Sequence, residues 1–388
     1  MDQDLEEALT DLRDYKLTIQ EKLVSISNRG PSFDLIRIAA VTIVLLHHAR
    51  IVEYADIRVD PLFHYSGGGI HFGLFAVFVF FAVSGFLVTP SLLWSKNVID
   101  FTSRRCLRIF PALIVVVIAT MTILGPALTT LSPSDYFFNS NLYRYAKNIL
   151  TLTYDYLPGV VDRNGHPIIV NGALWTLHFE VLSYGTLALT SLLGLLRRRS
   201  LFLVFFLVSY GMNLALNLDP SLLVELPQRF LTFIKLFVYF GAGATFFLFA
   251  DRIPFSKAMA VSACALIMIA WPFGLGSLVL PLCLPYIIIF CGLSVLPGQP
   301  ILKHDLSYGV YLIHAPILAT VSWFFPGLRN WWLVAAIVFL ITLGLSYLSW
   351  TFVEGPALRQ KKRVSIWLNS RFDLFCALRN KNKNAGVA

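Results

Sequence analysis

The stretch IRIAAVTIVLLHHAR, residues 36–50, places four basic or titratable side chains in a run apolar enough for a lipid bilayer. Ionisable groups inside a membrane helix are costly to bury and are usually functional. Arg37 and His48 are eleven residues apart, about three full helical turns, so they share one helix face. A guanidinium suits phosphate, whereas an imidazole can take a proton or act as a nucleophile. His47 points about 80° away from the Arg37 line.

The pattern also allows structural explanations for His48 and Arg37. His48 is either a functional group or a hydrogen-bonded packing histidine, and its position on the Arg37 face favours function. Asp34 lies one turn before Arg37 and can pair with it.

Further polar residues interrupt other apolar runs. Trp175, His178 and Glu180 open one run, in GALWTLHFE, and Tyr311 and His314 lie within another, in SYGVYLIH. Each could serve packing or capping. Their number within one chain makes packing or capping alone a weaker explanation and favours a functional group of residues.

The composition is that of an integral membrane protein. Of 388 residues, 57% are hydrophobic and 14% are charged, where a soluble domain has about 25% charged residues. The net charge of +9 follows the membrane pattern described next, so we expect no nucleic-acid partner. The five cysteines lack metal-ligand spacing, and we expect neither a disulfide framework nor a metal cofactor.

Hydropathy predicts an all-α polytopic membrane bundle of about ten transmembrane helices. The predicted spans are residues 35–52, 70–92, 110–130, 172–196, 201–218, 229–250, 257–274, 276–296, 306–325 and 331–352. Most of the 31 lysines and arginines fall on one side if the N-terminus is cytoplasmic. The positive-inside rule therefore places both termini in the cytoplasm.

The two chain ends are predicted to be separate from the membrane domain, which we place at residues 31–358. Residues 1–30 show a heptad-like leucine and isoleucine spacing, which predicts an amphipathic helix that forms a homodimer through 5–26 or docks on the membrane or bundle. Residues 359–388 form a basic tail, predicted to lie in the cytoplasmic interface and contact membrane lipids.

The longest polar stretch, residues 131–171, is predicted to lie on the opposite face and is rich in tyrosine and phenylalanine. Such rings can anchor a protein at the membrane interface, pack, or form platforms for a sugar ring. A loop of this length is more often functional than a bare connector.

Six strings in this order resemble the acyltransferase 3 family of membrane O-acyltransferases. They are FDLIRIAAVTIVLLHHA, FFAVSGFL, RRCLRIFPAL, LPGV with VNGALWTLHFE, LSYGVYLIHAPI and FVEGPALR, over residues 33 to about 360. The resemblance implies about ten helices in the bacterial inner membrane. It also implies transfer of an acyl group, often acetyl from acetyl-CoA, to a hydroxyl of an extracytoplasmic or lipid-linked carbohydrate.

Acyl transfer to a hydroxyl needs a base or nucleophile, oxyanion stabilisation and a bound donor. The residues expected to carry catalysis are His48 and Glu180. The residues expected to bind the donor phosphates are Arg37, Arg105 and Arg108. The residues expected to contact the acceptor are Asp34, Trp175, Tyr311 and His314. Whether His48 is a base or an acyl carrier stays open, and His314 is a weaker catalytic candidate.

Two other classes of function compete with the enzyme. A transporter or acyl-group translocator also uses many helices with internal charges, but the sequence shows no internal repeat and no matched pair of broken helices. A scaffold or sensor would explain the terminal helices but not the intramembrane polar residues.

Overall fold

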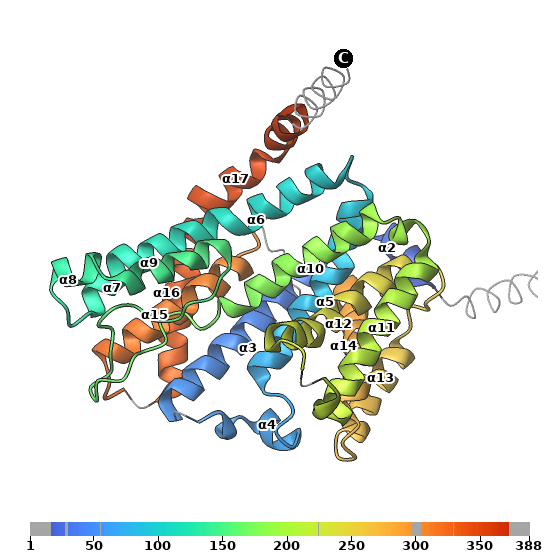
Figure 1. Cartoon of the computed structure of the whole chain (residues 1–388). Coiled ribbons are helices and arrows are strands. Elements are labelled where there is room, and N and C mark those ends of the chain that lie inside the picture. The colour runs from blue at the N-terminus through green and yellow to red at the C-terminus, as the bar shows by residue number, and fades with distance from the viewer. Residues whose placement is uncertain are drawn as a thin grey trace, which may run out of the picture. The chain divides into compact units, whose positions relative to one another are not determined.

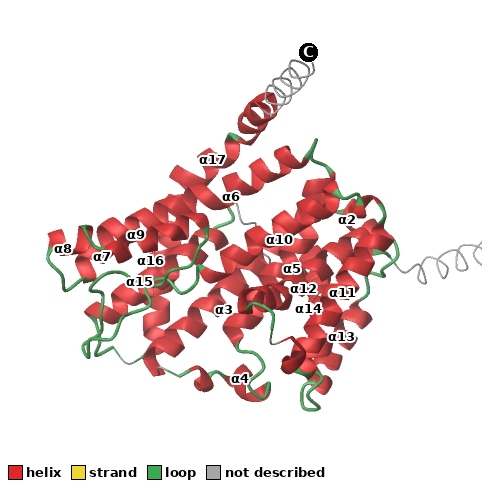
Figure 2. Ribbon diagram, in the orientation of Figure 1, coloured by secondary structure: helices red, strands yellow, loops and turns green. Residues whose placement is uncertain are grey.

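The computed structural model describes residues 17–27, 30–54, 56–223, 225–295, 304–328 and 330–371. Within these ranges the regular elements are helices, and Figure 2 shows them joined by loops without a strand. The chain divides into two compact units. The first comprises residues 1–47, 54–90 and 194–303, and the second comprises residues 48–53, 91–193 and 304–388.

The first unit is built on long apolar helices. Its helices are α2 (Ile19–Ser25), most of α3 (Phe33–Tyr54), η1 (Ile57–Val59), α4 (Pro61–Tyr65), most of α5 (Phe72–Leu93), η4 (Leu195–Arg197), α11 (Arg199–Leu218), η5 (Pro220–Leu223), α12 (Gln228–Leu248), α13 (Lys257–Ala270) and α14 (Gly276–Leu293). Helix α12 contacts both α11 and α14, and α13 packs against α14 (Figure 1). The middle of α12 is accordingly buried.

Small residues let α5 and α12 approach closely. A Cβ atom built on Gly85 would lie 1.9 Å from the carbonyl oxygen of Phe240, and one on Gly243 would lie 2.3 Å from that of Ala82. Neither position can hold a side chain without moving the helices apart. Membrane helices pack in this way because small residues bring two backbones into van der Waals contact.

The second unit contains the remaining helices. They are α6 (Val98–Ala119), η2 (Thr120–Leu124), α7 (Gly125–Leu128), α8 (Pro133–Phe137), α9 (Ser140–Ala146), η3 (Lys147–Leu150), α10 (Trp175–Leu192), α15 (Ser307–Phe324), α16 (Trp331–Ser349), η6 (Trp350–Glu354) and α17 (Gly355–Arg359), together with residues 48–53 of α3. Helix α6 contacts α10, α15 and α17, and α15 packs along α16 (Figure 1). Two π-helical turns, η2 and η6, continue α6 and α16.

Each of the ten predicted spans is helical in the structure. Seven helices in the described part of the chain are long and apolar enough to cross a membrane. The other three predicted spans are α10, α13 and α15. Helix α13 has 14 residues, and α10 and α15, with 18 each, carry the polar side chains noted above. The count of ten crossings and the cytoplasmic termini stay predictions.

The described parts of the two chain ends are helical. Helix α2 begins with a capping box between Thr18 and Glu21, and its Ile19 N–H donates to the carbonyl of Ile253 at 2.9 Å. The buried Ile19 side chain shows that this part of the N-terminal segment docks on the first unit. Most of segment 5–26 lies outside the described residues, so the homodimer stays a prediction. In the tail, residues 361–371 are helical and residues 372–388 are not described.

The polar stretch 131–171 holds three short helices. Tyr136 and Tyr145 in this stretch are fully buried, so these two rings pack inside the second unit. Phe138 and Tyr143 are exposed, with 85% and 60% of their surface accessible. These exposed rings, rather than the buried pair, are available to a membrane interface or a sugar.

Candidate active site

Two histidines far apart in the sequence meet in the second unit. The Nδ1 atom of His48 lies 2.9 Å from the Nε2 atom of His314, although 266 positions separate the residues. Their rings are stacked, with centroids 5.2 Å apart and planes 10° from parallel. His48 is half-buried and His314 is fully buried. The predicted catalytic and acceptor-side histidines therefore belong to one hydrogen-bonded pair.

The backbone of α15 fixes the direction of this hydrogen bond. The Nδ1 atom of His314 lies 2.9 Å from the carbonyl oxygen of Tyr311 and 3.1 Å from that of Val310. Because a carbonyl oxygen only accepts, Nδ1 of His314 carries the proton and Nε2 holds the lone pair. His48 then donates from Nδ1, which leaves its own lone pair on Nε2. The network thus assigns a basic Nε2 to His48.

A proline in the same helix explains a supporting contact. Pro316 has no N–H and cannot donate to the carbonyl of Leu312, four residues earlier in α15. The Nδ2 atom of Asn171 donates to that carbonyl instead, at 3.0 Å. Asn171 is fully buried. The sequence interpretation missed this residue. The proline inside a predicted helix was the available signal, because it leaves the carbonyl four residues earlier in need of another donor.

Tyr311 holds the start of α10. Its hydroxyl donates to the carbonyl of Ala173 at 2.8 Å and shares a short hydrogen bond with the hydroxyl of Thr176. The side chain is buried. Tyr311 therefore orders the turn that leads into Trp175, whose half-buried ring packs edge-on against Phe179.

Glu180 follows one turn later on α10. It is half-buried and accepts a short hydrogen bond from the hydroxyl of Tyr184. A carboxylate held by a tyrosine can orient a hydroxyl or an imidazole through its other oxygen. The position is compatible with the role predicted for Glu180, which stays a prediction.

The RRCLR string lies on helix α6 and not in a loop between spans. Arg104 pairs with Asp100 at 2.7 Å, as expected for residues four apart on a helix. The half-buried Arg105 approaches Ser91 Oγ at 3.3 Å and lies over the ring of Phe101. The predicted span began at residue 110 because these charges lower the hydropathy, whereas the helix begins at Val98.

Arg108 lies between two carboxylates in the second unit. It pairs with Asp305 at 2.5 Å and with the buried Glu354 at 3.0 Å, and it lies over the ring of Tyr308. Glu354 ends the π-helical turn η6. These contacts tie α6 to the residues that precede α15 and to the turn that follows α16. Of the three predicted donor-binding arginines, Arg108 is paired with two protein carboxylates.

Arg37 lies in the first unit and pairs with Asp34 at 2.9 Å, as predicted. Both side chains retain solvent exposure, 24% for Arg37 and 46% for Asp34. The guanidinium is thus accessible near the start of α3.

Comparison with known proteins gives the family. A family model described as an acyltransferase domain matches residues 31–351. The chain belongs to the acyltransferase 3 family. This acyltransferase is 30% identical to "O-acetyl transferase" of Shigella phage Sf6, over 87% of its own length and 99% of the relative's. It is 28% identical to "Nodulation protein 10" of Rhizobium leguminosarum bv. viciae, over 86% and 94% of the two lengths. No solved structure matches it.

The family fits the architecture. This acyltransferase is a multi-pass helical membrane protein and an enzyme that transfers an acyl group to oxygen. The site residues named above come from this chain's own geometry, because the comparisons assign no residue a role.

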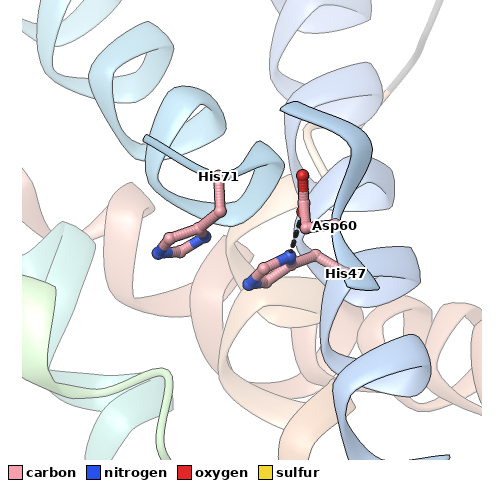
Figure 3. A group of neighbouring side chains, drawn as sticks. All are labelled: His47, Asp60 and His71. Carbon is pink, nitrogen blue, oxygen red and sulfur yellow. Dashed lines mark hydrogen bonds and ion pairs between the residues drawn. The ribbon is translucent and has the colours of Figure 1, made fainter. Parts of the chain in front are cut away.

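A second cluster in the acyltransferase gathers His47, Asp60 and His71 in the first unit, as Figure 3 shows. The Nδ1 atom of His47 lies 2.7 Å from the Oδ2 atom of Asp60, and the His47 and His71 rings stack at 4.3 Å. The sequence interpretation correctly separated His47 from His48. It did not predict that His47 contacts Asp60 and His71.

Proposed function

We propose that this O-acyltransferase moves an acetyl group from cytoplasmic acetyl-CoA to a hydroxyl of an extracytoplasmic or lipid-linked carbohydrate. The observation that carries the proposal is the His48–His314 hydrogen bond, whose direction places a basic Nε2 on His48. Acyl transfer to a hydroxyl needs such a base. The printed name of the phage relative, "O-acetyl transferase", supports acetyl as the transferred group. The saccharide acceptor is proposed from the family resemblance described under Sequence analysis.

The proposed reaction is a direct transfer. Nε2 of His48 takes the proton of the acceptor hydroxyl while the oxygen attacks the thioester carbonyl. The resulting tetrahedral oxyanion collapses, the carbon–sulfur bond breaks, and the thiolate leaves with the proton returned by His48. His314 holds the imidazole in the required tautomer, as an orienting partner does in other base-assisted transfers. An alternative order, in which His48 carries the acyl group, gives the same products.

Donor binding is assigned to arginines. The donor carries several phosphates, and guanidinium groups bind phosphate through paired, charge-assisted hydrogen bonds. Arg37 and Arg105 are both partly exposed and are proposed to contact the donor. Arg108 was predicted to join them. Its two carboxylate partners make it the weaker phosphate ligand and favour a role in holding α6 in place.

Acceptor binding is assigned to residues around α10. The ring of Trp175 is proposed to stack on a sugar, and Glu180 to accept from a sugar hydroxyl. Tyr311 and His314 are proposed to act by ordering the acceptor side, since their side chains are buried in contacts with the backbone. Asp34 is proposed to act through Arg37.

The enzyme is proposed to work in the bacterial inner membrane.

The proposal is tested with membranes that contain the enzyme and acetyl-CoA labelled in the acetyl group. Label is expected in the saccharide fraction, and surface polysaccharide from cells without the gene is expected to lack the corresponding ester. A translocator without transferase chemistry would leave the label on CoA or on a small carrier. That outcome would contradict the proposal.

A further inference from the structure

We propose that His47, Asp60 and His71 bind a divalent transition-metal ion of the zinc class. The three residues lie in the first unit, on α3, directly before α4 and directly before α5 (Figure 3). Each offers one ligand atom, and these atoms lie within 4.8 Å of one another. Two imidazoles and a carboxylate form a ligand set that zinc uses, with a further position for water.

The carboxylate of Asp60 is arranged to make one more bond. Its Oδ1 atom accepts from the backbone N–H groups of Leu62 and Phe63, at 2.8 and 3.2 Å. Its Oδ2 atom accepts from the N–H of Phe72 at 3.0 Å. A carboxylate has about four acceptor positions. Three are filled by backbone, and the fourth faces Nδ1 of His47, where a metal would replace the shared proton.

The His47 ring is fixed by its surroundings. A Cβ atom built on Gly73 would lie 2.4 Å from Cδ2 of His47, so only glycine leaves room for the imidazole there. His47 and Asp60 have 6% and 2% of their surface exposed, whereas His71 is half-buried. Metal ligands need this kind of orientation by neighbouring groups, and the backbone bonds to Asp60 supply it.

The ligand atoms lie within 4.8 Å of one another and must rearrange to hold an ion. Zinc–nitrogen and zinc–oxygen bonds of about 2.0 Å at tetrahedral angles set ligand atoms roughly 3.3 Å apart. The His47–Asp60 distance of 2.7 Å would widen slightly. The ring of His71 would turn out of its stack on His47 and move towards the pair, because the lone pairs of two parallel rings cannot converge on one ion. Its Nδ1 atom accepts the N–H of Leu74 at 3.2 Å, a bond at the start of α5 that a turn of the ring can release.

Two charged groups have opposite effects on the binding of a cation at His71. Asp60 attracts a cation, and Lys235 of α12 acts electrostatically on His71 and opposes one. We therefore expect Lys235→Met to tighten metal binding. A bound ion would tie the segment before α5 to α3 at the residue that precedes His48 in the chain. The metal would act as a clamp there and not as a partner in acyl transfer.

The test uses the full-length enzyme, purified in detergent through an affinity tag without histidine. After exposure to zinc and removal of unbound ion, wild type is expected to retain about one zinc per chain by mass spectrometry. Asp60→Asn and His71→Ala are expected to retain none. The matched controls Asp56→Asn and His64→Ala remove a carboxylate and an exposed imidazole from the same segment, and are expected to bind as wild type does.

A substitution at the cluster could abolish zinc binding simply by unfolding the protein. Zinc binding is therefore also measured on wild type alone. Wild type stripped with a chelator is expected to show a Tm that rises with zinc concentration, as binding to the folded state requires. Cobalt(II) is expected to give the visible spectrum of nitrogen and oxygen ligation. Wild type that retains no zinc and shows no rise in Tm would overturn the proposal, as would Asp60→Asn with unchanged binding.

Discussion

At the scale of residues, the site depends on one pair that no sequence spacing reveals. Helical phase separated His48 from His47 correctly, and the structure gives each a different partner, His314 and Asp60. The 266 positions between His48 and His314 explain why their contact could not be predicted. Local spacing, by contrast, predicted the Arg37–Asp34 pair directly.

His314 is a positioning residue, and its replacement tests that role. His314→Ala is expected to lower kcat about 10- to 100-fold with little change in KM, because His48 loses the acceptor that sets its tautomer. His314→Gln places an amide oxygen near the Nε2 position and is expected to recover part of the loss. Steady-state kinetics with both variants measure this. Equal damage from both would indicate a purely packing role.

Arg105 is expected to act on donor binding alone. Arg105→Ala removes charge-assisted hydrogen bonds and should raise KM for acetyl-CoA about 10- to 100-fold while kcat changes little. Its neighbour Arg104, already paired with Asp100, provides the matched control. Arg104→Ala should leave KM near the wild-type value. If Arg105→Ala and Arg104→Ala raise KM by the same factor, the loss of any positive charge explains the effect. The assignment of Arg105 to donor binding then fails.

At the scale of elements, hydropathy predicted each long apolar helix in the described part of the chain, and its errors have physical causes. The predicted start of α6 was twelve residues late because Arg104, Arg105 and Arg108 made a helical stretch look like a loop. The π-helical turn that carries Glu354 left no sequence signal. Pro316 leaves the carbonyl of Leu312 without its helical donor, and Asn171, distant in the chain, supplies one. The sequence alone does not show which residue does so.

The close approach of α5 and α12 gives a stability prediction. Gly85→Ala puts a methyl group where the carbonyl of Phe240 lies, and should lower the free energy of unfolding by about 1–3 kcal/mol. Gly185→Ala on α10 meets no atom within 4 Å and should be neutral or stabilising by about 0.5–1 kcal/mol. Thermal unfolding in detergent compares the two. A Gly85→Ala enzyme as stable as Gly185→Ala would contradict the packing described.

At the scale of the whole molecule, the orientation in the membrane is a prediction from the charge distribution and can be tested separately. A cysteine at the exposed Phe138 is expected to react with a membrane-impermeant maleimide added to intact spheroplasts. A cysteine at the exposed Trp367 in the tail should react only after the membrane is opened. The cysteine-free parent serves as background. Labelling of the tail from outside would reverse the predicted topology.

The central claim is that His48 supplies the base for acyl transfer. It is tested most directly by the transfer of labelled acetyl from acetyl-CoA to the saccharide fraction, in membranes with matched amounts of wild type, His48→Ala and His47→Ala. We expect His48→Ala to insert normally and lose about 10²- to 10⁴-fold in transfer, and His47→Ala to lose less. Transfer by His48→Ala at the wild-type rate would contradict the account.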